Sequence, residues 1–389
     1  MVAILAAVVP NLPKVLPEPD RVLQAASSIS QHVVGPTLRS KMFPGTVTES
    51  TMRLLHELSR LHNNQKTWKK DVGDAFDDSR FFSMDVMLVK DDWMPLLRQW
   101  SQADKDKIAE LVGRINAPST AGIVFGVGAT SARLEADRKT QLNLRRIATL
   151  ILSATEDTFV TSIPVIFDKV QELLLATSSS SPSSATRADV YMVIRAMVLK
   201  MSAIHLAVLW PVVNSEMHAA ISSVVAPDHS AASETYTNTG ILQACKLLDL
   251  LICAAPDDFQ LHEWLFVNDT IDAVYRSFSS SSIALVDELS EELGSTAAST
   301  LHTGDANGQL PTSSNSKSRR PLLGAGGIGD DVVVERKDEL VAKILRPFFG
   351  QLSIYAFETT YALSTLDRDV CVQGVLKDIF DEKTIVKAL

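Results

Sequence analysis

Residues 131–154, SARLEADRKTQLNLRRIATLILSA, decide the fold class of this chain. Their apolar side chains recur at helical spacing and form one stripe, made of Leu134, Leu144, Ile147, Leu150 and Ile151. The same spacing is found upstream in residues 20–34 and 48–61. No segment shows the sustained alternation of apolar and polar residues that a strand would need. The sequence therefore predicts an all-α protein.

The amino-acid composition favours the same fold class. The 389 residues are 46% hydrophobic but only 6% aromatic, and Leu, Ala, Val and Ile are abundant. Such a mixture is typical of helices packed on helices. We expect an α-solenoid of the HEAT or armadillo type, in which antiparallel helix pairs follow one another through short turns, although no repeat with a strong signature is found.

Two polar stretches divide the expected helices into parts. Residues 177–187 are rich in Ser, and residues 294–331 are rich in Ser, Thr, Gly and Asn with almost no large apolar side chains. Because such compositions cannot bury enough apolar surface to form a core, we expect a flexible linker in the first and disorder in the second. The predicted parts are then a solenoid over residues 1–176 and 188–293, and a C-terminal helical unit over residues 332–389.

Charge and membrane-related features narrow the class of protein. A formal net charge of -9 argues against broad nucleic-acid binding, because a duplex selects a basic surface. Three cysteines are too few for a disulfide framework and fit a reducing cytosol. Residues 1–10 lack the basic start of a signal peptide, and we interpret them as the end of a core helix whose partners precede it. No stretch reaches the roughly 20 apolar residues of a membrane-spanning helix, so we expect a cytoplasmic chain with peripheral membrane contact.

Enzyme and metal motifs are incomplete in this sequence. The His-Glu pairs at 56–57 and 262–263 begin a zinc-protease motif, but Arg and Phe stand where the second histidine belongs. The glycine-rich residues 122–131 match neither the P-loop nor the dinucleotide-binding pattern. No nucleophile elbow is found either. We therefore expect a protein that is not an enzyme, with no catalytic residue, metal or cofactor.

Two basic clusters are candidates for a surface that binds anionic lipid or an acidic partner. They consist of Lys66, Lys69 and Lys70, and of Arg133, Arg138, Lys139, Arg145 and Arg146. Cations on one helix face are attracted to phosphorylated head groups. Alternatively, these side chains pair with carboxylates of neighbouring helices. We favour pairing for Arg145 and Arg146, which lie beside core positions, and for the lysines, which four aspartates follow.

A protein-binding surface is the other candidate site. Residues 239–276 combine an almost wholly apolar helix with an aromatic-rich one, and the final helical unit also carries aromatic side chains. Large apolar side chains of this kind anchor protein interfaces when they are exposed. The candidate interface residues are Phe259, Leu261, Trp264, Phe266, Phe348 and Phe349.

Four blocks of sequence resemble, in this order, the C-terminal region of Dopey proteins, particularly fungal ones. They are residues 63–82, NNQKTWKKDVGDAFDDSRFF; residues 93–100, WMPLLRQW; residues 126–152, GVGATSARLEADRKTQLNLRRIATLIL; and residues 245–276, CKLLDLLICAAPDDFQLHEWLFVNDTIDAVYR. From its apolar positions alone we expect the first block to be a helix pair anchored by Trp68, Val72, Phe76, Phe81 and Phe82.

The resemblance implies a process rather than a site. Dopey proteins are very large, helical and without known catalytic residues, and they are peripheral scaffolds of membrane traffic at the Golgi and endosomes. The resemblance implies a Mon2-type partner, together with links to an aminophospholipid flippase, to phosphatidylinositol 4-phosphate and, in animals, to kinesin light chain. No residue of this chain can be assigned to any of these partners. The alternative function is a module that binds phosphoinositides directly through its basic helix faces.

Overall fold

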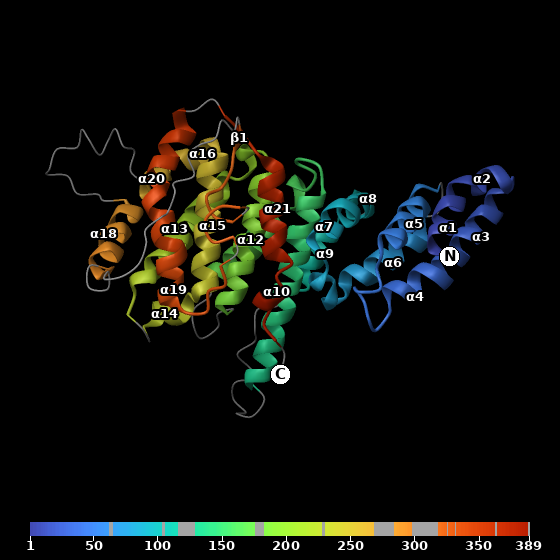
Figure 1. The fold of residues 1–389 in the computed structure, drawn as a ribbon, viewed down its shortest axis with the longest axis horizontal. Coiled ribbons are helices and arrows are strands. Elements are labelled where there is room, and N and C mark those ends of the chain that lie inside the picture. Colours follow the sequence, from blue (N-terminus) through green and yellow to red (C-terminus); the bar gives the residue numbers. More distant parts are fainter. Residues whose placement is uncertain are drawn as a thin grey trace.

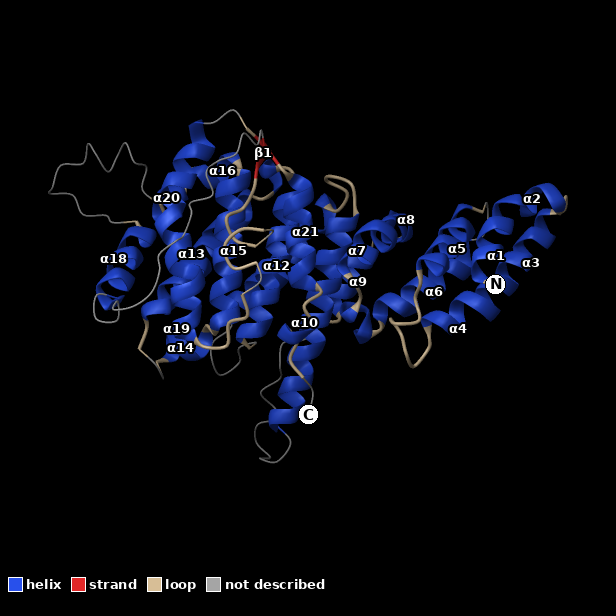
Figure 2. Ribbon diagram, viewed as in Figure 1, coloured by secondary structure: helices blue, strands red, loops and turns tan. Residues whose placement is uncertain are grey.

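The structure, a computed structural model of the protein, is helical almost throughout the residues that it describes (Figures 1 and 2). Those residues are 1–61, 65–102, 106–115, 129–175, 183–227, 230–267, 284–297, 318–324, 326–330, 332–361 and 364–387. Within them, strand is confined to β1 (Ser318–Arg319) and β2 (Thr365–Leu366), which pair in parallel. The predicted all-α class is confirmed.

Short helices make up the N-terminal end of the molecule, at the right of Figure 1. They are α1 (Val2–Val8), η1 (Val9–Asn11), α2 (Leu12–Val15), α3 (Pro19–Ile29), η2 (Ser30–Val34), α4 (Gly35–Leu38), α5 (Glu49–Arg60), α6 (Gln65–Asp77) and η3 (Ser79–Ser83). Helix α5 begins at a cap that the sequence predicts, because the Thr48 hydroxyl accepts the N–H of Thr51 at 3.3 Å. Helix α1 packs against α5.

The helix pair predicted for residues 63–82 is confirmed over α6 and η3. Its five anchor side chains are fully buried, as predicted from their apolar positions: Trp68, Val72, Phe76, Phe81 and Phe82. The Phe81 ring makes edge-on contacts with Phe76 at 5.2 Å and with Trp93 at 5.1 Å between ring centroids. Aromatic packing therefore joins this pair to the helices that follow.

The centre of the molecule is built from long helices in adjacent layers. The elements from residue 86 to residue 200 are α7 (Val86–Leu88), η4 (Val89–Trp93), α8 (Met94–Gln102), α9 (Lys107–Gly113), α10 (Ala129–Ser153), η6 (Val160–Ser162), α11 (Ile163–Leu175) and α12 (Ser184–Lys200). Helix α12 packs against α10 on one side and against α15 on the other (Figure 1). Nearly every residue of α12 is buried, and the charged residues among them, including Asp189 and Arg195, are paired with side chains of other helices.

The remaining elements complete the opposite end and then return to the centre. They are η7 (Ala203–His205), η8 (Ala207–Leu209), α13 (Trp210–Ser222), η9 (Ser223–Val225), α14 (Ala231–Thr235), α15 (Asn238–Ala254), α16 (Asp257–Gln260), η10 (Glu263–Leu265), α18 (Leu285–Ala297), α19 (Lys337–Leu340), η11 (Val341–Leu345), α20 (Arg346–Tyr361), α21 (Arg368–Ile379) and η12 (Glu382–Thr384). Helix α20 packs on α15 and α18. Helix α21 instead runs back to pack on α10 and α12 (Figure 1).

The two predicted linkers fall only partly on described residues. Residues 177–182 of the Ser-rich linker lie outside them, Ser183 caps the N-terminus of α12, and residues 184–187, which we expect in the linker, belong to α12. Of the range 294–331, residues 298–317, 325 and 331 also lie outside. Among the described residues from 318 to 330, Leu322 and Leu323 donate their backbone N–H groups to the carboxylate of Asp249 on α15. This part of the range is therefore held against a helix, contrary to the disorder that we expect there. The boundaries of the predicted parts stay a prediction.

Candidate functional site

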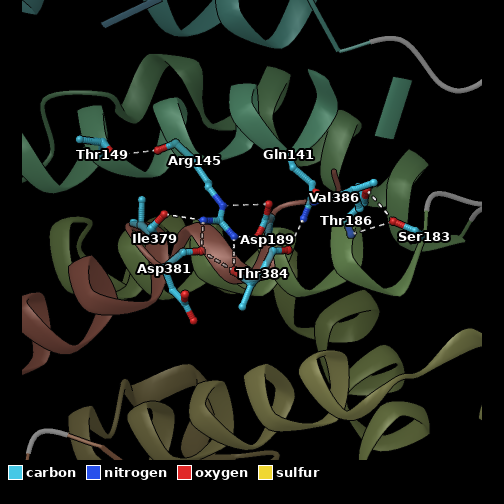
Figure 3. A network of polar contacts seen from close by, with 10 residues as sticks. All are labelled: Gln141, Arg145, Thr149, Ser183, Thr186, Asp189, Ile379, Asp381, Thr384 and Val386. Carbon is cyan, nitrogen blue, oxygen red and sulfur yellow. Dashed lines mark hydrogen bonds and ion pairs between the residues drawn. The ribbon is translucent and has the colours of Figure 1, made fainter. Parts of the chain in front are cut away.

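Arg145, a candidate surface cation for which pairing within the protein is the favoured alternative, lies at the centre of a buried polar network (Figure 3). It is fully buried on α10 and faces Asp189 of α12, which its Nε and Nη2 atoms both contact at 3.2 Å. Its Nη1 atom donates to the carbonyl oxygens of Ile379 at 2.6 Å and Asp381 at 3.0 Å. Its Nη2 atom also donates to the Thr384 hydroxyl at 2.5 Å. All five N–H groups of the guanidinium are therefore occupied, and none remains for a ligand.

The network fixes the end of the chain that follows α21 onto α10. Gln141, one turn before Arg145, donates from its amide nitrogen to the Thr384 carbonyl at 3.3 Å. Its amide oxygen accepts the backbone N–H of Val386 at 2.8 Å (Figure 3). Burial raises the pKa of Asp189, and the positive charge of Arg145 opposes that rise. The arrangement joins α10 to α12 and to the end of α21 through hydrogen bonds, and is a structural contact rather than a reactive centre.

Arg146 is buried as well and cannot form part of a surface. Its Nε and Nη2 atoms donate to the carbonyl oxygens of Phe76 at 2.9 Å and Asp77 at 2.6 Å, and its Nη1 atom donates to Asn143 at 3.1 Å. Burial lowers the pKa of Arg146 from its ordinary value. Both residues are therefore removed from the candidate ligand surface, in agreement with the alternative favoured from the sequence: Arg145 pairs with the carboxylate of Asp189, whereas Arg146 binds mainly carbonyl groups of α6. Both side chains bind groups of other helices, since they lie on the face of α10 that is turned inward.

The other basic candidates lie nearer the solvent. Lys70, Arg133 and Lys139 are exposed, whereas Lys69 and Arg138 are half-buried. Lys139 lies 3.5 Å from Glu135 on the same helix. Lys69 lies over the Trp68 ring, 5.8 Å from its centroid. The side chain of Lys66 lies outside the described residues. The exposed members stay a predicted anionic-lipid or acidic-partner surface.

The candidate interface residues divide into a buried group and an exposed pair. Phe259, Phe266, Phe348 and Phe349 are core side chains, which corrects their placement on a surface. Phe259, for example, packs against the Trp210 ring at 5.7 Å between centroids. Leu261 and Trp264, by contrast, are 73% and 57% exposed. In residues 257–266, sequence spacing could not separate buried from exposed side chains, because α16 and η10 are too short to show a helical period.

A second buried ion cluster was not singled out from the sequence. Asp378 of α21 contacts Arg195 of α12 at 2.6 Å and Lys246 of α15 at 2.5 Å. Although burial by itself would raise the pKa of Asp378, the charges of Lys246 and Arg195 lower it to about 2. The only sign of this cluster in the sequence is that its charged residues lie within apolar stretches, because a buried charge needs an opposite charge or a hydrogen-bonding group beside it.

A third buried carboxylate, Asp249 of α15, binds main chain instead of a cation. Its oxygens accept the N–H groups of Leu322 at 3.0 Å and of Leu323 at 2.7 Å. Burial raises the pKa of Asp249 to about 7, although the two N–H groups lower it. This contact holds the segment before α19 against α15. The sequence signal for it is a single aspartate within the almost wholly apolar residues 244–254.

Metal and membrane features were sought over the described ranges alone. There, no group of three or more His, Cys, Asp and Glu residues is arranged to hold a metal ion. No described helix is long and apolar enough to cross a membrane. In the described residues, helices are thus joined by buried ion pairs, and Leu261 and Trp264 form an exposed apolar pair.

Comparisons with known proteins identify relatives along almost the whole chain. A family model described as DOP1 C-terminal matches residues 1–362. Protein dop1 of Emericella nidulans is 45% identical over 385 residues, which cover 99% of this chain and 20% of that protein. Protein DOP1 of Saccharomyces cerevisiae is 27% identical over 347 residues, which cover 87% of this chain and 18% of that protein.

An animal relative is similar over a shorter range. Protein DOP1B of Xenopus laevis is 26% identical over 295 residues, covering 68% of this chain and 12% of that protein. The chain thus spans no more than 20% of the length of these three relatives. No solved structure matches it. The family match over residues 1–362 and the 45% identity across 99% of the chain show that it belongs to the DOP1 or Dopey family, within the C-terminal region of those proteins.

Proposed function

We propose that this chain is part of a non-catalytic scaffold that acts in membrane traffic at the Golgi and endosomes, together with a Mon2-type protein. Membership of the Dopey family supports this function, because the family resemblance implies that process and that partner. In this proposal the chain is cytoplasmic and reaches the membrane peripherally. An aminophospholipid flippase and phosphatidylinositol 4-phosphate are further proposed partners of the whole protein.

The observation that carries the scaffold proposal is an exposed apolar surface at the α16 end of the central helices. It consists of Leu261 and Trp264 together with Ile204 on η7 and Val208 on η8, which are 78% and 57% exposed. Element η7 packs against both α16 and η8, and α16 packs against η10, so the elements that carry these residues are neighbours. Exposed apolar side chains gathered in this way mark protein-binding surfaces.

The packing order supports the finer architecture that we propose, a HEAT or armadillo-like solenoid. Helices α10, α12 and α15 form successive layers, and α13 packs on α15. Each layer contacts its neighbour, as in stacked repeats. Successive helix pairs that superpose on one another would support the solenoid, whereas pairs that cross at unrelated angles would contradict it.

Co-purification with the Mon2-type protein of the same organism tests the scaffold proposal. The variant Leu261→Glu with Trp264→Glu should lose about 30-fold or more in affinity, because each change removes an apolar anchor of the proposed interface. Met42→Glu is the matched control, since Met42 is also a largely exposed apolar residue but lies near the N-terminal end. Equal affinity in both variants and the unchanged protein would exclude this surface as the binding site.

Direct phosphoinositide binding is the second candidate function, and the exposure of Lys70, Arg133 and Lys139 favours it. Flotation with vesicles that contain phosphatidylinositol 4-phosphate should weaken as salt rises, since the Debye length falls from about 10 Å at 0.1 M to about 3 Å at 1 M. Lys70→Glu with Lys139→Glu should weaken flotation further. Flotation that depends on neither salt nor these lysines would contradict the proposal.

A further inference from the structure

The segment from Ser318 to Gly324 lies along α15, α20 and the junction of β2 with α21 in the manner of a bound peptide. It adds β1 in parallel to β2, with Ser318 opposite Thr365. The carbonyl of Arg319 accepts the N–H of Asp367 at 2.9 Å. The carbonyl of the next residue accepts the hydroxyl of Tyr355 at 2.7 Å. The groups that hold this part of the segment therefore come from β2, from Asp367 at the N-cap of α21 and from α20.

Asp249 of α15 supplies two further hydrogen bonds to the main chain of the segment. It is fully buried within α15, and both of its carboxylate oxygens accept N–H groups of the segment, from Leu322 and Leu323. A buried carboxylate without such donors would be strongly destabilising, because its charge would have lost water without replacement. Asp249 is thus positioned to bind the backbone of an extended chain, whichever side chains that chain carries.

Side chains of the segment contribute only a few specific contacts. Leu323 is 6% exposed and belongs to the hydrophobic core cluster. Arg320 lies 2.9 Å from the carboxylate of Asp367, and Arg319 donates to the carbonyl of Thr359 at 3.3 Å. The contacts define a ligand chemistry, namely a pair of arginines followed at a short distance by a buried apolar residue.

The chain leaves this path through a glycine turn. Gly324 donates its N–H to the carbonyl of Ile328 at 3.0 Å, and Ile328 donates to the carbonyl of Leu322 at 2.8 Å. Gly324, Gly326 and Gly329 have φ angles of +73°, +84° and +76°, which favour glycine. The tight turn returns the chain toward α19, so the extended part ends directly after Leu323.

We propose that α15, α20 and the junction of β2 with α21 form a peptide-binding groove, which residues 318–324 fill within the same chain. The groove accepts in their place an extended partner peptide with two arginines and a following buried leucine. Recognition rests mainly on main-chain hydrogen bonds, as in other modes that add a strand to a protein, so a peptide from another protein can make the same bonds. The groove shares no residue with the Leu261–Trp264 surface.

The proposal can be tested with a variant in which residues 318–324 no longer occupy the groove. In Leu323→Glu the segment cannot bury its anchor, because a charged side chain is excluded from the core. A fluorescein-labelled peptide with the sequence of residues 318–330 should then bind this variant at least tenfold more tightly than the unchanged protein, as measured by fluorescence anisotropy. Adding Asp249→Asn to the variant should weaken that binding at least tenfold.

Controls make the outcome decisive. A labelled peptide in which Arg320 and Leu323 are both replaced by Glu should not bind. If thermal melting shows that Leu323→Glu is not folded, Arg320→Glu releases the same segment by repulsion from Asp367 without altering the core, since the Arg320 side chain is 55% exposed. No peptide binding to either emptied variant, or binding that Asp249→Asn leaves unchanged, would overturn the proposal. Either result is independent of binding to a Mon2-type protein.

Discussion

Arg145 and Asp189 form the most enclosed ion pair among the described residues, with side chains 0% and 1% exposed. Replacing Arg145 by Ala would leave the Asp189 carboxylate buried without a cation, which typically lowers the free energy of unfolding by about 3–5 kcal/mol. Thermal and urea denaturation measure the loss. The double variant Arg145→Met with Asp189→Leu should recover much of it, and Lys139→Ala, an exposed change on the same helix, should alter stability by less than about 0.5 kcal/mol.

Asp249 predicts a pH dependence of stability with a definite sign. Its pKa is about 7 in the folded protein, where Arg195 and Lys246 are the cations that lower it, against about 3.9 for an ordinary Asp. Because the folded state binds the proton more tightly, the stabilising contribution is fully present below about pH 4 and is lost as the pH rises through about 7.

Denaturation between about pH 5 and 8 checks this sign. Relative to Asp249→Asn, the unchanged protein should lose unfolding free energy on the order of 3 kcal/mol over that range. Asp257→Asn, at an exposed position of α16, is the control and should leave the profile of the unchanged protein as it is. A parallel decline in all three proteins would contradict the assignment to Asp249.

At the residue scale, sequence predicts burial well where a helix has a clear apolar stripe, and it names no partner for a buried charge. The five anchors of residues 63–82 are buried as predicted, because an apolar helical stripe has one side on which to lie. Arg145 is buried because acceptors from Asp189 and from residues after α21 surround it. Those acceptors are distant in sequence, so periodicity in α10 alone cannot show whether its cations meet water or protein.

At the scale of elements, α21 is held in place by charge as well as by apolar contact. Removing the carboxylate in Asp378→Ala would leave Arg195 and Lys246 facing each other without an anion. We expect backbone amides of α21 to exchange hydrogen about tenfold faster or more, because local opening of the helix becomes easier. Mass spectrometry of deuterated peptides measures this change.

The same helix offers a matched control for that measurement. Asp369→Ala removes an exposed carboxylate near the start of α21 and should leave exchange within α21 nearly unchanged. Exchange in α1 and α5 should not respond to either variant, since those helices lie at the N-terminal end of the molecule (Figure 1). Equal acceleration in both variants would show that the ion cluster does not secure the helix.

Helices whose sequence shows an apolar period could be predicted. Segments that are held in place only by hydrogen bonds to distant residues could not. The long helix expected over residues 131–154 is observed as α10, Ala129–Ser153. The pairing of β1 with β2 and the placement of residues 318–324 were not predicted, since Ser- and Gly-rich composition indicates that a segment cannot form a core by itself. Composition cannot show that Asp249 accepts hydrogen bonds from the backbone N–H groups of Leu322 and Leu323.

At the scale of the whole molecule, the centre depends on the last part of the chain. Ending the protein at residue 363 would remove α21 and η12, and with them the acceptors of Arg145 and the anion of Arg195. We expect such a truncated protein to melt at a lower temperature and to be cut faster by protease within α10 and α12. An unchanged melting temperature would mean that α10 and α12 are stable without α21 and η12.

The return of α21 to the central layers also sets the order of events during synthesis. Gln141 and Thr384, which are hydrogen-bonded, are 243 residues apart in the chain. At about 5–20 residues per second, the ribosome delivers the second roughly 10–50 s after the first. Contacts at such separation raise the contact order and slow folding. Until α21 has been synthesised, the faces of α10 and α12 that it covers lack this contact, so we expect the region to be among the last to complete its folding.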